Sequence, residues 1–80
     1  MHYLIKRNED IGEEMITYKR LWELMATKHI SQYFLKANGI SNSTLTRLKR
    51  DEAVSTETIN KLCAILECKV EDIMEYLNKP

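Results

Sequence analysis

The chain has 80 residues, of which 44% are hydrophobic and 30% charged, and its formal net charge is zero. This length fits one domain with a modest core, and the hydrophobic fraction is too high for a disordered chain. No apolar run approaches the ~20 residues of a membrane span, and the N-terminus lacks a signal-peptide core, so the sequence predicts a cytoplasmic protein without a membrane partner.

The charges are distributed unevenly along the chain. Residues 28 to 50 contain five cations and no carboxylate, whereas residues 51 to 80 contain seven acids and three cations. A block of one sign in a neutral chain is compatible with a phosphate-binding surface, and equally with a solvated basic face. The five cations are Lys28, Lys36, Arg47, Lys49 and Arg50.

The N-terminal part divides into an extension and a first helix. Residues 1–14 have weak periodicity and are interpreted as a flexible extension, with a short extended piece at HYLI, and the domain is expected over residues 15–80. Because apolar residues recur with helical spacing, a helix is predicted from Tyr18 to Lys28, capped by Thr17. Trp22 is expected to be the largest core residue. The helical stripe consists of Tyr18, Leu21, Trp22 and Met25.

Two short helices follow, with a glycine between them. Ser31 is expected to cap the helix from Gln32 to Asn38, and Gly39 ends it by adopting a left-handed conformation. Ser41 caps the next helix, from Asn42 to Arg50. The apolar positions of this region are Phe34, Leu35 and Ala37 in the first helix, Ile40 in the turn, and Leu45 and Leu48 in the second helix.

The remaining chain is also read as helical. Ser55 is expected to cap a helix that runs through Glu67. A short last helix is predicted from Val70 to Leu77, because Val70, Ile73, Met74 and Leu77 again have helical spacing. The fold class is therefore all-α, with five short helices and no sheet. The stripe of the longer helix consists of Ile59, Leu62, Cys63 and Leu66.

No set of residues resembles a catalytic or metal centre. Cys63 and Cys68 are five positions apart, which is not a structural zinc spacing, and a cytosolic location favours free thiols. His29, at a helix end, is expected to be a surface or capping residue. We therefore expect a protein that is not an enzyme and has no cofactor, metal or small-molecule substrate.

Residues 31–50 have the pattern of a helix-turn-helix. In that motif the second helix enters the major groove and reads bases near its N-terminal end. Small residues at its start let the backbone approach DNA closely, and cations in its later turns meet phosphates. The candidate DNA-binding residues are Ser41, Asn42, Ser43, Thr44, Thr46, Arg47, Lys49 and Arg50.

From Met15 to Leu77 the chain resembles the small Cro and phage-repressor-type (lambda-repressor-like) helix-turn-helix regulators. The pieces that carry the resemblance read GISNSTLTRL, STETINKLCAILEC and VEDIMEYL. The resemblance implies a five-helix bundle that binds double-stranded operator DNA, usually as a homodimer. It also implies that Asn42, Ser43 and Arg47 read bases. Gln32 and Arg50 would contact phosphates.

These observations favour a sequence-specific transcriptional regulator that represses by occupying a promoter. The alternative is a protein-binding adaptor, such as a phage-encoded modulator, that kept the bundle with weak or no DNA binding. The zero net charge and the acidic second half keep this alternative open. Met74, Tyr76 and Leu77 are the candidates for a homodimer interface, although Met74 and Leu77 equally fit packing of the last helix on the core.

Overall fold

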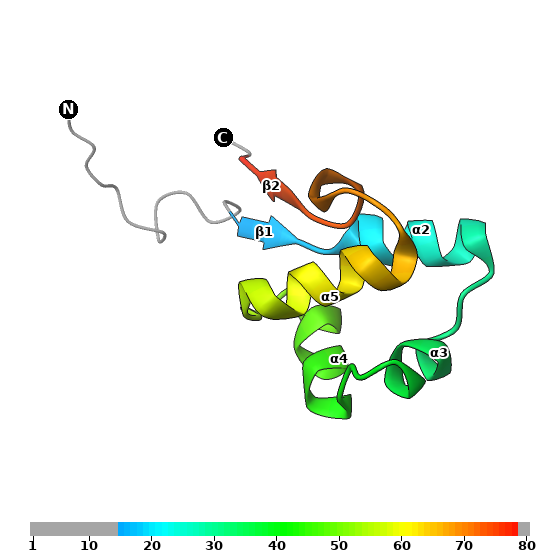
Figure 1. Cartoon of the computed structure of the whole chain (residues 1–80). Helices are drawn as coiled ribbons and strands as arrows, with labels where there is room; N and C mark the ends of the chain where they lie inside the picture. Colours follow the sequence, from blue (N-terminus) through cyan, green and yellow to red (C-terminus); the bar gives the residue numbers. More distant parts are fainter. Residues whose placement is uncertain (1–14, 79–80) are drawn as a thin grey trace.

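The computed structural model describes residues 15–78, so the predictions for the extension and for HYLI lie outside it. Four α-helices, a 3-10 turn and a two-stranded sheet make up the described part (Figure 1). In chain order the elements are β1 (Met15–Thr17), α2 (Lys19–Lys28), α3 (Gln32–Ala37), α4 (Asn42–Lys49), α5 (Thr56–Leu66), η1 (Val70–Asp72) and β2 (Glu75–Leu77).

Three serines begin three of the helices, as predicted. The hydroxyl oxygens of Ser31, Ser41 and Ser55 each accept a hydrogen bond from the backbone N–H three residues later, at 3.1–3.2 Å. Each bond satisfies an amide of the first turn that has no partner within its own helix. The starts of α3, α4 and α5 are therefore determined by local sequence.

The start of α2 differs in detail from the prediction. The residue at its N-cap is Tyr18 rather than Thr17, although the Thr17 hydroxyl still accepts from the first helical amide, that of Lys19, at 3.2 Å. Trp22 was expected to be the largest core residue, but it is only partly buried at the edge of the core. Tyr18 and Leu21, on the same stripe, are 3% and 0% exposed.

The turn between α3 and α4 has the predicted glycine conformation. Gly39 has φ +103°, which residues with a side chain rarely adopt. A Cβ added there would meet only the Lys61 Nζ atom, at 4.0 Å, so backbone conformation rather than crowding requires the glycine. Ile40 then points into the core and is 3% exposed, as predicted.

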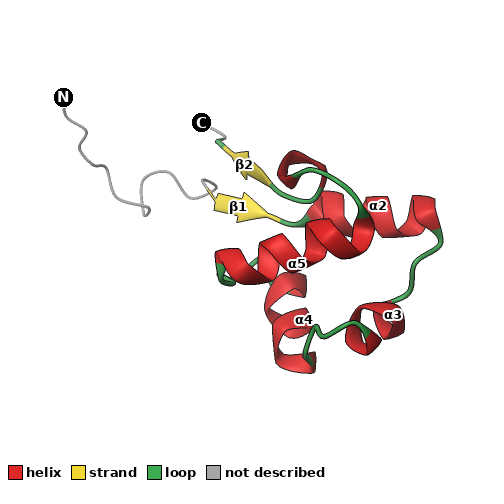
Figure 2. Ribbon diagram, in the orientation of Figure 1, coloured by secondary structure: helices red, strands yellow, loops and turns green. Residues whose placement is uncertain are grey.

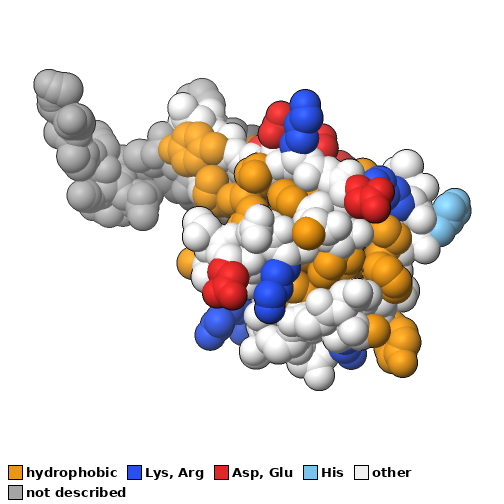
Figure 3. Space-filling view, in the orientation of Figure 1, with side chains coloured by type: hydrophobic (Ala, Val, Ile, Leu, Met, Phe, Trp, Pro, Cys, Tyr) orange, Lys and Arg blue, Asp and Glu red, His pale blue; other side chains and the backbone are white. Residues whose placement is uncertain are grey.

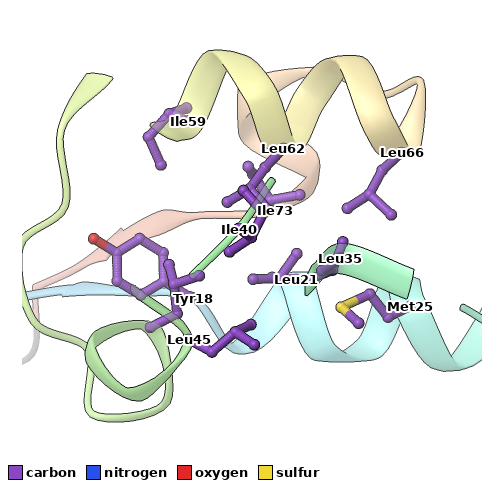
Figure 4. Close-up of a cluster of buried hydrophobic side chains, with 11 residues drawn as sticks. Tyr18, Leu21, Met25, Leu35, Ile40, Leu45, Ile59, Leu62, Leu66 and Ile73 are labelled. Atoms are coloured by element: carbon purple, nitrogen blue, oxygen red, sulfur yellow. The ribbon is translucent and has the colours of Figure 1, made fainter. Parts of the chain in front are cut away.

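One apolar cluster joins all the helices (Figure 4). In α3 only Leu35 is buried; Phe34 and Ala37, predicted as apolar positions of this helix, are exposed. A helix of six residues presents only one or two side chains to the core. The buried hydrophobic residues are Tyr18, Leu21, Met25, Leu35, Ile40, Leu45, Leu48, Ile59, Leu62, Leu66 and Ile73.

The prediction of a fifth helix over residues 70–77, and of a fold without a sheet, is wrong. Residues 70–72 form the 3-10 turn η1, and β2 pairs with β1 in an antiparallel two-stranded sheet (Figure 2). Met15 lies opposite Leu77, and Thr17 lies opposite Glu75. Pairing with β1 supplies the segment with inter-strand hydrogen bonds, and this tertiary partner overrides its helical periodicity.

Polar contacts hold this C-terminal segment against α2. The Arg20 guanidinium lies 2.7 Å from the Glu75 carboxylate and also donates to the Glu71 carbonyl at 2.9 Å. The Asp72 carboxylate accepts from the Lys69 amide at 2.9 Å, which closes the 3-10 turn. Asp72 thus closes the turn, and Glu75 joins β2 to α2 through an ion pair.

Asp51 connects the end of α4 to the junction of β1 and α2. Its backbone has φ 57°, and its carboxylate accepts from the Thr17 hydroxyl at 3.1 Å and from the Tyr18 amide at 2.9 Å. The Tyr18 hydroxyl in turn donates to the Glu52 carbonyl at 3.0 Å. Burial, followed by the nearby Asp51 charge, raises the pKa of Tyr18, so the phenol remains a donor.

Substitutions at Asp51 separate the contribution of its carboxylate from that of its backbone. We expect Asp51→Ala to lower the free energy of unfolding by about 2–4 kcal/mol, because it leaves the Tyr18 amide unpaired and strains a positive φ. Asp51→Gly should lose about 1 kcal/mol less, since glycine adopts this conformation freely. Asp51→Asn should lose least, because asparagine tolerates positive φ and keeps an acceptor.

Urea denaturation of the three variants measures this order. Equal losses for Ala and Gly would show that the conformation at residue 51 contributes nothing. An Ala variant as stable as the original protein would show that the two hydrogen bonds do not stabilise the fold.

Candidate nucleic-acid interface

Helices α3 and α4 lie next to each other on the side of the molecule away from the strands (Figures 1 and 2). Leu45 and Leu48 fix the orientation of α4, because they are 2% and 0% exposed in the core. The other faces of α4 are therefore turned toward solvent. The exposed residues among the sequence-predicted set are Ser41, Asn42, Ser43, Thr46, Arg47, Lys49 and Arg50.

Hydroxyl groups at the start of α4 bind one another. The Ser41 hydroxyl lies 3.1 Å from that of Ser43 and donates to that of Thr44 at 3.0 Å, besides capping the helix. Thr44 is also partly buried. The cluster orders the first turn of α4. The cap by Ser41 was predicted, but the sequence pattern did not reveal the structural role of Thr44.

Asn42 and Arg47 have side chains available for a ligand. Neither the Asn42 amide nor the Arg47 guanidinium bonds to another side chain or backbone group of residues 15–78. The Thr46 hydroxyl donates a hydrogen bond to the Asn42 carbonyl, at 3.1 Å, and its oxygen can still accept one. Exposed donors without an internal partner are what recognition of base edges requires.

The five cations of the basic block lie in different environments, and one of them binds within the protein. The Lys28 ammonium donates to the Leu66 carbonyl at 2.6 Å, so it caps the end of α5. Lys36 and Lys49 are exposed on α3 and α4. Arg50 lies 4.0 Å from the Glu52 carboxylate, and both side chains are exposed, so this ion pair is weak and leaves Arg50 able to bind another anion.

Two aromatic residues on α3 are exposed, and this exposure was not predicted from the sequence. Tyr33 is 76% exposed and Phe34 is 46% exposed. Gln32, predicted to contact phosphate, is the first residue of the same helix and is partly buried. A helical projection from Leu35 would have shown Tyr33 on the opposite face, because residues two positions apart point in nearly opposite directions.

The described residues carry neither a metal-binding cluster nor a membrane-spanning segment. Within residues 15–78, no three His, Cys, Asp or Glu side chains are grouped so that they could hold a metal ion. No helix in this part of the chain has the length and hydrophobicity to cross a bilayer. What the α3–α4 surface offers is hydrogen-bond donors, cations and exposed aromatic rings.

Comparison with known proteins agrees with this geometry. The family model for the Cro/C1-type HTH DNA-binding domain matches residues 20–79. The crystal structure of the transcriptional regulator VanUg is similar, with a TM-score of 0.78 and 28% sequence identity, over 99% of this chain and 100% of that one. No curated protein matches the sequence. Because the family model spans well over half of its residues, the chain belongs to the Cro/C1-type helix-turn-helix DNA-binding domain family.

Proposed function

We propose that this protein is a sequence-specific transcriptional regulator that inserts α4 into the major groove of double-stranded DNA. The observation that carries the proposal is the exposed face of α4. Within residues 15–78, Asn42 and Arg47 have no side-chain partner there, and Lys49 in the last turn and Arg50 at the C-cap add two further cations. Family membership supplies the ligand class. We expect it to act in the cytoplasm, as a binding protein rather than an enzyme.

Base recognition is assigned to Asn42, Ser43 and Arg47. A guanidinium can donate two hydrogen bonds to the O6 and N7 atoms of guanine, and an asparagine amide can form two hydrogen bonds with N6 and N7 of adenine. Ser43 adds an exposed hydroxyl at the tip of the helix. The short side chains of the first turn keep the backbone of α4 able to approach the base pairs.

Phosphate contacts are assigned to the other polar residues of this side. Lys36, Lys49 and Arg50 are exposed cations, and phosphate contacts fix the position of a protein on DNA without reading sequence. Gln32 adds a neutral donor at the start of α3. We expect regulation by occupancy: the bound protein excludes polymerase from a promoter and so represses it.

We propose that the protein acts as a homodimer through its two-stranded sheet. A single helix-turn-helix reads few bases, and a twofold dimer doubles the site. Ile16 and Tyr76 lie opposite each other across the strands and are 38% and 57% exposed. Met74 and Leu77 are partly buried. Leu77 belongs to the opposite face of the strand from Tyr76, so Tyr76 is the principal candidate for the interface.

A second candidate function is protein binding through α3. Tyr33 and Phe34 present exposed aromatic rings, which are common in protein interfaces. An adaptor of this kind would bind DNA weakly or not at all. The salt dependence of DNA binding distinguishes the two functions.

Binding to random duplex DNA should weaken steeply as salt rises. If two to four cations of each domain meet phosphates, the logarithm of the affinity should fall by about 2–4 units for each log unit of salt. Fluorescence anisotropy with a labelled random duplex measures the slope. Absence of binding at low salt would remove the DNA-binding proposal and leave the adaptor.

Arg47 and Arg50 should have distinguishable roles. On a site selected from a random DNA library, Arg47→Ala should cost about 1–3 kcal/mol and relax the preference at one base pair, with a smaller loss on random DNA. Arg50→Ala should weaken binding to both DNAs alike and reduce the salt slope by about one unit.

Lys28→Gln is the matched control for these two variants. It removes a cation from the same basic block, but one that binds the Leu66 carbonyl, so the salt slope should not change. If all three variants lost affinity equally on every sequence, the recognition-helix assignment would have to be given up.

The dimer proposal predicts that Tyr76→Glu lowers the molecular mass in solution at micromolar concentration. A carboxylate placed on an apolar interface loses its hydration without gaining a partner. Sedimentation equilibrium measures the mass, with Tyr33→Glu as a control because it places the same charge on an exposed aromatic site of α3. A strictly monomeric original protein at high micromolar concentration would contradict the proposal.

A further inference from the structure

Cys63 and Cys68 form a pair that the proposed DNA-binding function does not use. Both are free thiols and both are partly exposed. They line an open, mostly apolar hollow between α5 and the segment that follows it, together with Ile59, Val70 and Met74. Figure 3 shows hydrophobic side chains gathered in this part of the surface. Both cysteines therefore lie at the surface, in the wall of an open hollow.

The backbone brings the two cysteines together through the way α5 ends. Glu67 adopts a left-handed conformation with φ 54°, and the Cys68 amide donates to the Cys63 carbonyl at 3.1 Å. This is the hydrogen bond of a Schellman motif, in which the residue after the left-handed position bonds back five residues. The side chains of these two positions commonly contact each other in that motif.

The same hydrogen bond satisfies the distance requirement of a disulfide. A disulfide needs Cα atoms within about 4.4–6.8 Å of each other. The bonded nitrogen and oxygen are one and two covalent bonds from their own Cα atoms, so a 3.1 Å hydrogen bond keeps Cα63 and Cα68 close to or within that range. The Cα separation is therefore compatible with a disulfide, once side-chain rotation brings the two sulfur atoms together.

The proximity of Cys63 also affects the ionisation of Cys68. Burial, then the Cys63 sulfur, raises the pKa of the Cys68 thiol to about 11; the Asp72 charge adds to this and the Lys28 charge opposes it. A hydrogen bond from the Cys68 thiol to Cys63 contributes to the shift. Cys68 therefore stays protonated near neutral pH.

We propose that Cys63 and Cys68 are a vicinal dithiol that a small-molecule disulfide converts reversibly into an intramolecular disulfide. The Cys63 thiolate attacks one sulfur of the small disulfide, which releases one thiolate and leaves a mixed disulfide on Cys63. Cys68 then gives its proton to solvent and attacks the Cys63 sulfur, which releases the second thiolate. The two protein thiols are oxidised and one small disulfide is reduced to two thiols.

Such a pair fits the reducing compartment in which a DNA-binding protein works. Cytosolic disulfides are usually transient and respond to oxidation. The disulfide would join the last turn of α5 to the chain that leads into η1 and β2, so oxidation would change one wall of the hollow. No residue of α3 or α4 lines the hollow, so the base-reading face is not itself modified.

The test titrates the full-length protein in glutathione redox buffers, under native conditions and in denaturing urea. After acid quenching, mass spectrometry reports the species that has lost two hydrogen atoms and both alkylatable thiols. The native fold should favour the intramolecular disulfide by at least about tenfold over the urea-unfolded chain, because the fold already holds the two residues together. Dithiothreitol should restore the dithiol.

Cys63→Ser and Cys68→Ser are the controls, and each should yield only a mixed disulfide with glutathione. Equal disulfide equilibria in the folded and unfolded chains would overturn the proposal. A native protein that forms only mixed disulfides, or only disulfide-linked dimers, would overturn it too. None of these measurements involves DNA, so they are independent of the proposed function.

Discussion

The hydrogen bonds of the Asp51 carboxylate hold together the two halves of this small domain. The chain leaves α4 through a left-handed residue, and the side chain of that residue then reaches the Thr17 hydroxyl and the Tyr18 amide. Since β1 ends at this junction and α2 begins there, the contact positions α4 relative to both elements. The strand β2 depends on the same junction, because it pairs with β1 and its Glu75 binds Arg20 of α2.

A recognition surface needs groups that remain unsatisfied within the protein, and rigidity in the helix that presents them. In α4 these two requirements fall on different residues. Ser41 and Thr44 order the first turn through their own hydroxyl groups, and Leu45 anchors the helix in the core. Asn42 and Arg47 can then keep their donors for a ligand. Residues of similar polarity in one short helix thus have either a structural or a proposed binding role, according to which face they occupy.

The helix ends of this protein do more than terminate the helices, because they also direct the chain and position particular side chains. Where α3 ends, Gly39 takes a positive φ and directs the chain into α4. Where α5 ends, Glu67 takes a left-handed conformation, brings Cys63 and Cys68 together and leaves their sulfur atoms in an open hollow. The Lys28 ammonium binds the final carbonyl of the same helix. A domain with few long elements uses its helix ends to place functional groups.

Local sequence determined the elements whose signals lie within a few residues. The three serine caps, the glycine turn and the leucines of α4 follow from short-range hydrogen bonding and helical spacing, and the exposed face of α4 follows with them. Only the tertiary structure determined the secondary structure of residues 70–77. Their spacing suits a helix, but their pairing partner, β1, comes from the other end of the domain. Tertiary structure likewise determined that Lys28 has a structural role, because the Leu66 carbonyl to which it donates is remote in sequence.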